Sequence, residues 1–373
     1  MPGAHASDVQ LAKGISSLPK TNRAAVYTKV GEVATEVREL SVPEPGPGQV
    51  LVKITHSGVC HSDLHVMLGD WSFVRGDDGG VGGHEGVGNV IAAGAGVDPS
   101  LLGKRVGIKW LATICMSCKQ CWHDRDCMCA GAKISGAGGA VGTPGTFQEY
   151  TLSDAKYVTP IPDGLDSELA APLLCGGVTV YKALKILKLE AGSWVAIPGA
   201  GGGLGHLGIQ YAKAMGYRVI AIDGGDDKKK LCESLGADVF VDFMKEGDNI
   251  VKAVRDAADG EGADAVVVVN SSARSYAQAP DFLAIGGTLV AVGIPGGSGP
   301  VTVEPAELVI RDIRIMGSAV GTRQDSVEAL ALAARGLVKP IVKVEDLSEL
   351  TNIFKKMHKG DLVARMVVKV SQD

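Results

Sequence analysis

Short runs in which apolar and polar residues alternate cover the first part of the chain, up to about residue 160. The segments 25–27 and 50–54 are typical, and the proline-rich turn 43–47 lies between them. A period of two, broken by glycine and proline, predicts short half-buried strands. This part of the chain is therefore expected to form a β-rich domain.

Beyond residue 178, apolar runs alternate with amphipathic stretches. Strands are predicted at 194–197, 217–222, 238–241, 265–269, 288–292 and 313–316. Between the first two of them, one helical face is predicted to hold Leu204, Leu207, Gly208, Tyr211, Ala212 and Met215. Strands that alternate with helices indicate a parallel sheet covered on both faces. Helices at 324–335 and 346–358 and a strand at 363–370 are expected to end the chain.

Composition supports a folded protein of two domains. The chain has 373 residues, 46% hydrophobic and 21% charged, with a net charge of −5. No basic run suggests nucleic acid, since Lys228-Lys229-Lys230 is expected to begin a helix. No apolar run is long enough for a membrane helix, and no signal-peptide core is visible. Asp8, with no arginine before Arg23, disfavours a mitochondrial presequence. We therefore expect a cytoplasmic protein.

A glycine-rich loop follows the predicted strand 194–197 and opens a helix. Its ligand candidates are Gly199, Gly202, Gly203, Leu204 and Gly205. Glycines let the backbone approach a pyrophosphate, and the helix N-terminus favours an anion. Asp223 ends the next strand, where an acid can accept hydrogen bonds from a ribose and repel a 2′-phosphate. This order favours NAD over NADP, while a tight turn without a ligand is the alternative.

Cysteines cluster in one lobe, 115–129, of a chain that has 8 of them. Cys115, Cys118, Cys121 and Cys129 have the spacing C-x2-C-x2-C-x7-C. Four thiolates can complete a closed, structural zinc site. From spacing alone Cys127 competes as fourth ligand, and an iron–sulfur cluster is a second interpretation.

Three further metal-ligand candidates lie far apart in the sequence. They are Cys60 in GVCHSDLH, His84 in GGHEGVG and Cys175 in CGGVTVYKALK. Two thiolates and one imidazole match the type of catalytic zinc site that keeps its fourth position open. Each residue could equally be an ordinary buried thiol or loop histidine. Spacing cannot bring such distant residues together.

The chain resembles the zinc-containing medium-chain alcohol dehydrogenases, in particular the tetrameric yeast and fungal type. The resemblance runs from about residue 24 to 370. It rests on the three motifs around Cys60, His84 and Cys175 and on the cysteine lobe. It also rests on GDW (69–71), GIKWL (107–111), YAKAMGYRVIAIDGG and ARGLVKP (334–340). In that family the fourth lobe cysteine falls at Cys129.

The resemblance implies an α/β fold with a β-rich GroES-like catalytic domain and a doubly wound Rossmann domain. The expected boundaries are 1–175 for the catalytic domain with its zinc lobe, 176–318 for NAD binding, and 319–373 for a return to the catalytic domain. A homotetramer is also implied, with NAD and two zinc ions per chain as cofactors.

The resemblance also implies a role for each residue near the catalytic zinc. Cys60, His84 and Cys175 would bind the metal, and Glu85 would be a transient fourth ligand. Asp63 would orient the imidazole of His84. The Ser62 hydroxyl would touch the substrate oxygen, His61 would lie near the cofactor phosphates, and His65 would end a proton relay through the nicotinamide ribose.

Cofactor and substrate contacts follow from the same resemblance. Asp223 and Lys228 would hold the adenosine ribose. The rest of the cofactor cleft would be lined by Val292, Ile294, Ser318, Val320 and Arg365. Trp71, Trp110 and Ile294 match pocket positions, and two indoles leave little room, so short primary alcohols such as ethanol are the expected substrates.

Other functions are weaker interpretations of the same residues. A zinc polyol or formaldehyde dehydrogenase of the same superfamily is disfavoured by the paired tryptophans. A non-enzymatic NADPH-binding relative, like the lens crystallins, would lack Cys60, His84 and Cys175. A nucleic-acid-binding zinc ribbon is disfavoured by acidic surroundings. The sequence departs from the family pattern in its N-terminal extension, in segment 75–80 and at Cys127.

Overall fold

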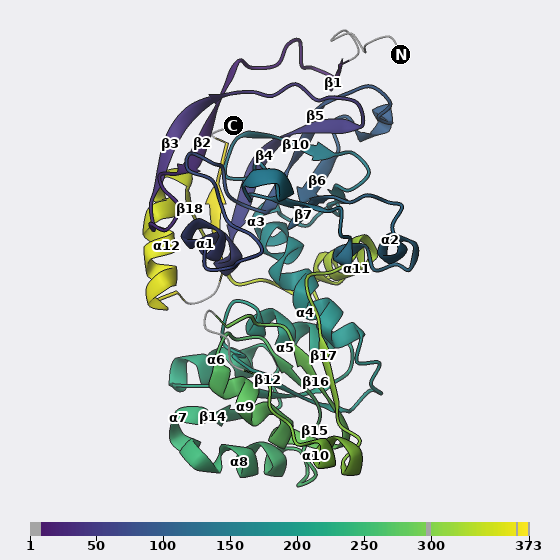
Figure 1. The fold of residues 1–373 in the computed structure, drawn as a ribbon, viewed down its shortest axis with the longest axis vertical. Coiled ribbons are helices and arrows are strands. Elements are labelled where there is room, and N and C mark those ends of the chain that lie inside the picture. Colours follow the sequence, from purple (N-terminus) through teal and green to yellow (C-terminus); the bar gives the residue numbers. More distant parts are fainter. Residues whose placement is uncertain (1–8, 296–299, 363–364, 372–373) are drawn as a thin grey trace. The chain divides into compact units, whose positions relative to one another are not determined.

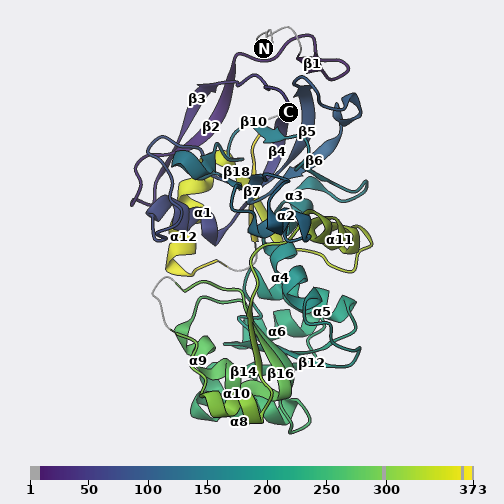
Figure 2. The ribbon, with the colours of Figure 1, turned by 45° about the vertical axis from the view of Figure 1, so that its right-hand side comes forward.

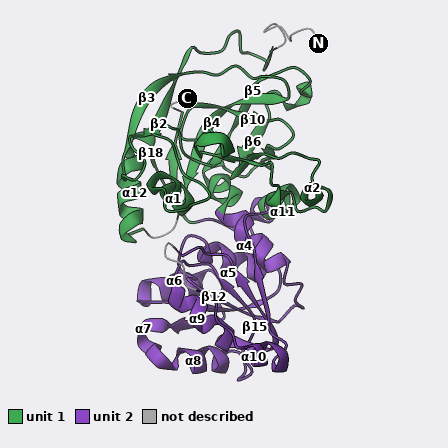
Figure 3. Cartoon of the chain, viewed as in Figure 1, with its two compact units in different colours: residues 1–175, 322–331, 341–373 green, residues 176–321, 332–340 purple. Residues whose placement is uncertain are grey.

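The chain folds into two compact units, shown in different colours in Figure 3. The structure, a computed structural model, describes residues 9–295, 300–362 and 365–371. Unit 1 comprises Met1–Cys175, Thr322–Ala331 and Ile341–Asp373, and unit 2 comprises Gly176–Gly321 and Leu332–Pro340.

Unit 1 is rich in β structure, as the alternating pattern predicts. Its strands are β1 (Gln10–Leu11), β2 (Thr21–Tyr27), β3 (Thr35–Ser41), β4 (Gln49–Val59), β5 (Glu85–Ala93), β6 (Arg105–Ile108), β7 (Leu111–Thr113), β8 (Lys133–Ser135), β9 (Gly142–Thr143), β10 (Tyr150–Asp154), β11 (Thr159–Pro160), β18 (Val342–Asp346) and β19 (Arg365–Lys369). The last of these lies within the predicted strand 363–370, of which residues 363–364 are outside the described part.

One mixed sheet organises unit 1, with the described strand order β11-β6-β5-β4-β19-β18. The long strand β4 pairs with β5, β10 and β19, all antiparallel. Its buried face contributes Val50, Val52 and Ile54 to the core. Because Gly58 on β4 pairs with Glu85 on β5, the end of one strand lies beside the beginning of the other.

The helices of unit 1 are short. They are α1 (His61–Leu68), η1 (Pro99–Leu101), α2 (Lys119–Trp122), η2 (Asp126–Met128), η3 (Gly139–Val141), α3 (Ser167–Ala170), η4 (Ala171–Leu174), η6 (Leu347–Glu349) and α12 (Leu350–Lys359), with the first part of α11 (Arg323–Ala334). Helix α12 lies beside α1 in two views (Figure 1, Figure 2).

Unit 2 is a parallel sheet with helices packed against it. The described strand order is β14 (Val239–Asp242), β13 (Arg218–Asp223), β12 (Trp194–Pro198), β15 (Ala263–Val268), β16 (Leu283–Ala291) and β17 (Arg314–Gly317). Every neighbouring pair is parallel. The first strand in sequence lies in the middle and the chain winds outward in both directions, which is the doubly wound arrangement. The expected fold class is thereby confirmed.

The helices of unit 2 lie before and between these strands. They are α4 (Gly176–Lys185), α5 (Gly205–Ala214), α6 (Asp226–Ser234), α7 (Phe243–Glu246), η5 (Gly247–Asn249), α8 (Ile250–Ala257), α9 (Ala273–Phe282) and α10 (Pro305–Ile310). All five residues of β12 are buried, as expected for the middle strand of a covered parallel sheet. Among the described residues, no helix combines the length and the apolar character that a membrane crossing needs.

Candidate active site and metal centres

Four potential metal ligands converge where β4 ends and β5 begins. The ligand atoms of Cys60, His84, Glu85 and Cys175 all lie within 4.8 Å of one another, and all four residues are buried. Cys60 follows β4 and precedes α1, whereas Glu85 is the first residue of β5. Cys175 follows η4. Tertiary pairing of the strands therefore unites residues that are far apart in the sequence.

Asp63 prepares the imidazole of His84 as a ligand. Its Oδ1 lies 2.7 Å from His84 Nδ1, and its Oδ2 accepts a hydrogen bond from the Cys60 amide at 2.9 Å. A carboxylate can only accept, so Nδ1 carries the proton and Nε2 keeps its lone pair. His84 Nε2 is buried and has no hydrogen-bond partner among the described residues. A buried lone pair beside two thiols is the donor arrangement that a zinc ion fits.

The pKa values of the two thiols of this cluster are shifted in opposite directions. A hydrogen bond from Cys175 lowers the pKa of Cys60 well below its ordinary value, against the effect of burial. The same hydrogen bond, together with burial, raises the pKa of Cys175. The cluster therefore already favours one thiolate, the form in which cysteine binds metal.

Glu85 is held by a buried ion pair. Both of its carboxylate oxygens contact Nη2 of Arg365, whose side chain is 5% exposed. Burial raises the pKa of Glu85 to about 7, although Arg365 opposes the rise. A Cβ atom at Gly58 would collide with this carboxylate, so the strand needs glycine there. Arg365, expected in the cofactor cleft, thus lies against Glu85.

Aromatic rings connect the helix α1 to the metal cluster. The ring centroids of His65 and Trp71 lie 4.7 Å apart. The rings of Trp71 and Trp110 meet edge to face with centroids 6.4 Å apart, and those of Trp110 and His84 do so at 4.8 Å. His61 lies 5.3 Å from His65, and Ser62 lies in the first turn of α1. The indole of Trp110 thus lies next to the candidate ligand His84, and the indole of Trp71 lies next to that of Trp110.

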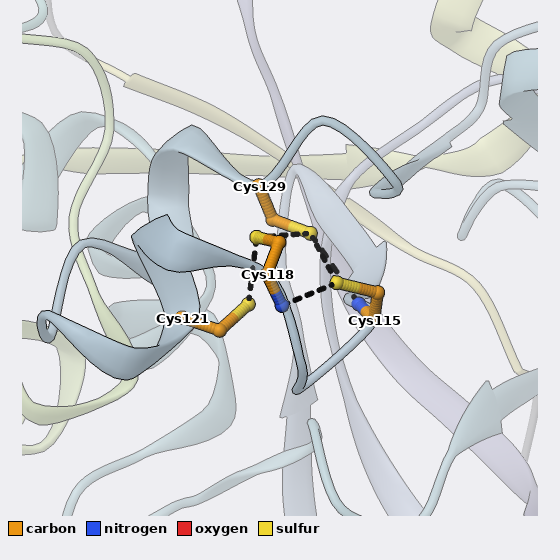
Figure 4. A group of neighbouring side chains, drawn as sticks. All are labelled: Cys115, Cys118, Cys121 and Cys129. Atoms are coloured by element: carbon orange, nitrogen blue, oxygen red, sulfur yellow. Dashed lines mark hydrogen bonds between the residues drawn. The ribbon is translucent and has the colours of Figure 1, made fainter.

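The second metal candidate is the cysteine lobe. The sulfur atoms of Cys115, Cys118, Cys121 and Cys129 lie within 4.8 Å of one another and point toward one another (Figure 4). Backbone amides of Cys115 and Cys118 each donate to a sulfur of the group at 3.3 Å. The structure brings Cys129 to the group and leaves Cys127 out of it.

The thiols of this lobe differ in pKa, since burial raises the pKa of Cys121 to about 12. The amide of Ser117 and the thiol of Cys129 lower the pKa of Cys115 to about 6. A tetrahedral site of four sulfur atoms has no open position, which is the pattern of a structural zinc site.

In unit 2, the glycine loop and Asp223 lie together at the carboxyl end of the sheet. Asp223 is buried and accepts hydrogen bonds from the Gly201 amide at 2.9 Å, from the Gly224 amide at 2.9 Å and from Lys228 Nζ at 2.8 Å. Gly199 has a φ of +86°, which favours glycine. A Cβ at Gly205 would meet the Ala200 backbone at 2.5 Å. The beginning of α5 therefore packs closely on the loop that precedes it.

Other expected cofactor residues follow the strands β16 and β17. The Ser318 amide donates to Ala291 at 2.9 Å, and the Ser318 hydroxyl is buried without a partner among the described residues. Val292 is half-buried, Ile294 is 49% exposed, and Val320 has a φ of +39°. All four lie at the same end of the sheet as Asp223.

Two residues near these sites, Asp70 and Lys109, have no role in the sequence-based prediction. Asp70 Oδ2 lies 2.8 Å from His65 Nδ1. Lys109 is buried beside Trp110, and its Nζ donates to the Tyr157 carbonyl and to Thr159 Oγ1, each at 2.8 Å. Burial lowers the pKa of Lys109 to about 7. Gly69, which can end a helix, was the sequence signal that could have drawn attention to Asp70. Nothing in the sequence indicates the position of Lys109.

A glycine loop with its acid on a doubly wound sheet, in one chain with two thiol-rich metal clusters, defines a metal-dependent dehydrogenase. The family model described as alcohol dehydrogenase GroES-like domain matches residues 46–163. The model described as zinc-binding dehydrogenase matches residues 203–335.

Relatives cover almost the whole chain. Alcohol dehydrogenase 2 of Emericella nidulans is 46% identical over 95% of this chain and 99% of its own length. An alcohol dehydrogenase of Schizosaccharomyces pombe is 43% identical over 95% of this chain and 100% of its own. The structure of acetophenone reductase from Geotrichum candidum in complex with NAD has a TM-score of 0.80 at 30% identity, and the match covers 95% of this chain and 98% of that one.

The chain therefore belongs to the zinc-binding alcohol dehydrogenases, and its relatives include fungal enzymes. Membership confirms the expected class, an oxidoreductase with zinc and a nicotinamide cofactor.

Proposed function

We propose that this enzyme interconverts short primary alcohols, such as ethanol, and their aldehydes by hydride transfer to and from NAD. The observation that carries the proposal is the buried Cys60–His84–Cys175 cluster beside the indole of Trp110, in which His84 Nε2 has no hydrogen-bond partner in the described part of the chain. We assign the catalytic domain to residues 1–175 and 319–373, and the binding of NAD to residues 176–318.

Zinc, when bound by Cys60, His84 and Cys175, supplies a Lewis acid that favours the deprotonated alcohol, and NAD, when bound, accepts the hydride. Asp63 keeps the proton of His84 on Nδ1, so that the lone pair of Nε2 is available to the metal. The four cysteines of the lobe would hold a second, structural zinc. Glu85 lies beside the cluster, paired with Arg365, and would be a transient fourth ligand.

Protein side chains move the proton that the alcohol loses. In the proposal, Ser62 Oγ contacts the substrate oxygen, and His65 takes up the proton and releases it to water. Its side chain is 15% exposed, which is enough contact with solvent for that release. A weak base such as His65 would suffice, because a zinc ion held by Cys60, His84 and Cys175 would lower the pKa of the alcohol.

Substrate size is the first testable part of this proposal. Trp71→Leu is expected to raise kcat/KM for hexanol relative to ethanol by about tenfold, since the pocket gains room for extra methylene groups. The measurement is a panel of primary alcohols, a polyol and acetophenone, the last because one relative carries that name. Trp122→Leu is the matched control, because Trp122 is 77% exposed in the cysteine lobe. An unchanged panel in Trp71→Leu would remove Trp71 from the pocket.

Cofactor choice depends on Asp223 in this proposal. Asp223→Gly is expected to lower the NAD:NADP preference by about 100-fold, because two charge-assisted hydrogen bonds to the ribose disappear. The variant also leaves Lys228 without the carboxylate that it contacts at 2.8 Å, so its ammonium can pair with a 2′-phosphate. Kinetics with both cofactors measure the ratio. Asp226→Asn, an exposed acid of the same turn, should keep the ratio of the unaltered enzyme; the same ratio in Asp223→Gly would contradict the assignment.

The proposal includes a cytoplasmic homotetramer, as the resemblance implies. Exposed apolar side chains of unit 2, such as Ile285, Val309 and Ile310, are the kind of surface that a subunit contact covers. Light scattering on the purified protein measures the state.

A further inference from the structure

The end of helix α1 folds back on the helix. Gly69 caps it in the left-handed conformation, with a φ of +71°. The amides of Gly69 and Asp70 both donate to the His65 carbonyl, at 2.9 and 3.1 Å. This cap reverses the chain direction immediately after the helix. As a result, the side chain of Asp70 lies beside His65 in the last turn of the helix.

Asp70 and Trp71 together fix the ring of His65. Asp70 Oδ2 lies 2.8 Å from His65 Nδ1, and the indole of Trp71 lies 4.7 Å away at an interplanar angle of 31°. The His65 side chain is 15% exposed and that of Asp70 is 36% exposed. One neighbour therefore contacts a ring nitrogen and the other a ring face, which leaves the imidazole little freedom to rotate.

A carboxylate beside Nδ1 decides where the neutral imidazole keeps its proton. Asp70 can only accept when ionised, so the proton resides on Nδ1 and the lone pair on Nε2. When Nε2 takes up a proton, the resulting cation faces the carboxylate and is stabilised by it. Asp63 has the same contact with His84, but there the pair is buried and serves a metal ligand.

We propose that Asp70 is a positioning residue of the reaction, which holds His65 with its proton on Nδ1 and presents Nε2 as the base. The inference rests on the proposed role of His65. In this proposal the alcohol hydroxyl would lose its proton by way of Ser62 Oγ and the nicotinamide ribose to His65 Nε2, which would release it to water, while the hydride and its electron pair would go to NAD. Asp70 gains no proton in this sequence.

The test combines Asp70→Asn, Asp70→Glu, His65→Gln and the double variant in the holoenzyme. Asp70→Asn is expected to lower kcat for ethanol about tenfold, while KM for NAD and the zinc content stay unchanged. In the His65→Gln background, the same change is expected to have no further effect. Asp70→Glu keeps the carboxylate and should retain more activity than Asp70→Asn. Glu32→Gln is the matched control, since Glu32 is exposed and pairs only with Lys29 among the described residues.

A second readout does not depend on turnover. Nitrogen-15 NMR of labelled histidine is expected to show the His65 proton on Nδ1 in the unaltered enzyme, and a changed tautomer population in Asp70→Asn.

The outcomes separate the inference from the proposed function. Full kcat in His65→Gln would remove His65 from the reaction and the inference with it. A loss in His65→Gln together with full kcat in Asp70→Asn would overturn the inference alone. An equal loss from Asp70→Asn in both backgrounds would also overturn it, because Asp70 would then act independently of His65.

Discussion

Replacement of His84 by alanine is expected to reduce turnover to less than about one ten-thousandth, because the Lewis acid loses its only nitrogen ligand. Zinc content should fall from two ions per chain to one. The cysteine lobe is built from other residues and keeps its metal. Steady-state kinetics and elemental analysis of one preparation measure both effects.

Controls distinguish loss of the ligand from loss of the fold. His84 is fully buried and bonds to Asp63, so its removal also leaves a cavity and an unpaired carboxylate. Far-ultraviolet circular dichroism should nevertheless remain close to that of the unaltered enzyme. His123→Ala, which changes an exposed histidine of the lobe, should leave kcat unchanged. Full activity in His84→Ala would show that the ligand assignment is wrong.

The second large effect is expected in the cysteine lobe. Cys118→Ser should lose the structural zinc and destabilise the protein by several kcal/mol (on the order of 3 or more), because the free energy of binding a structural metal contributes to folding. Thermal unfolding and zinc per chain measure the change. The short helices α2 and η2 have few buried residues of their own, so the lobe depends on its metal.

Cys127→Ser provides a matched control within the same lobe. Cys127 is buried but does not belong to the group of four sulfur atoms. This variant should keep two zinc ions and lose less stability than Cys118→Ser. If the two variants lost zinc equally, Cys127 and not Cys129 would deserve the assignment as fourth ligand.

Local patterns predicted much of the fold. Buried strands such as β12 and β13 are apolar runs, and the glycine loop that follows β12 is visible in the sequence. The predicted strand 288–292 is longer in the structure, since β16 begins at Leu283. Its first half contains Ile285 at 76% exposure and two glycines, so it has no apolar run to recognise.

The candidate site could be predicted only in part. The ligands of the lobe are close in sequence, and spacing alone indicated metal, although it left Cys127 and Cys129 as alternatives. Cys60, His84 and Cys175 meet only through the pairing of β4 with β5 and the packing of η4, so their grouping needed a family resemblance. The helix cap at Gly69 brings Asp70 to His65. The pattern of apolar and polar residues does not predict where a single side chain points after such a turn.

The central claim is that one zinc performs the chemistry and another holds the fold. Zinc per chain and the rate of NAD reduction with ethanol, measured on one purified sample before and after mild chelation, test it most directly. We expect two zinc ions per chain and loss of activity together with the more labile ion. One zinc per chain, or ethanol oxidation that continues unchanged after chelation, would contradict it.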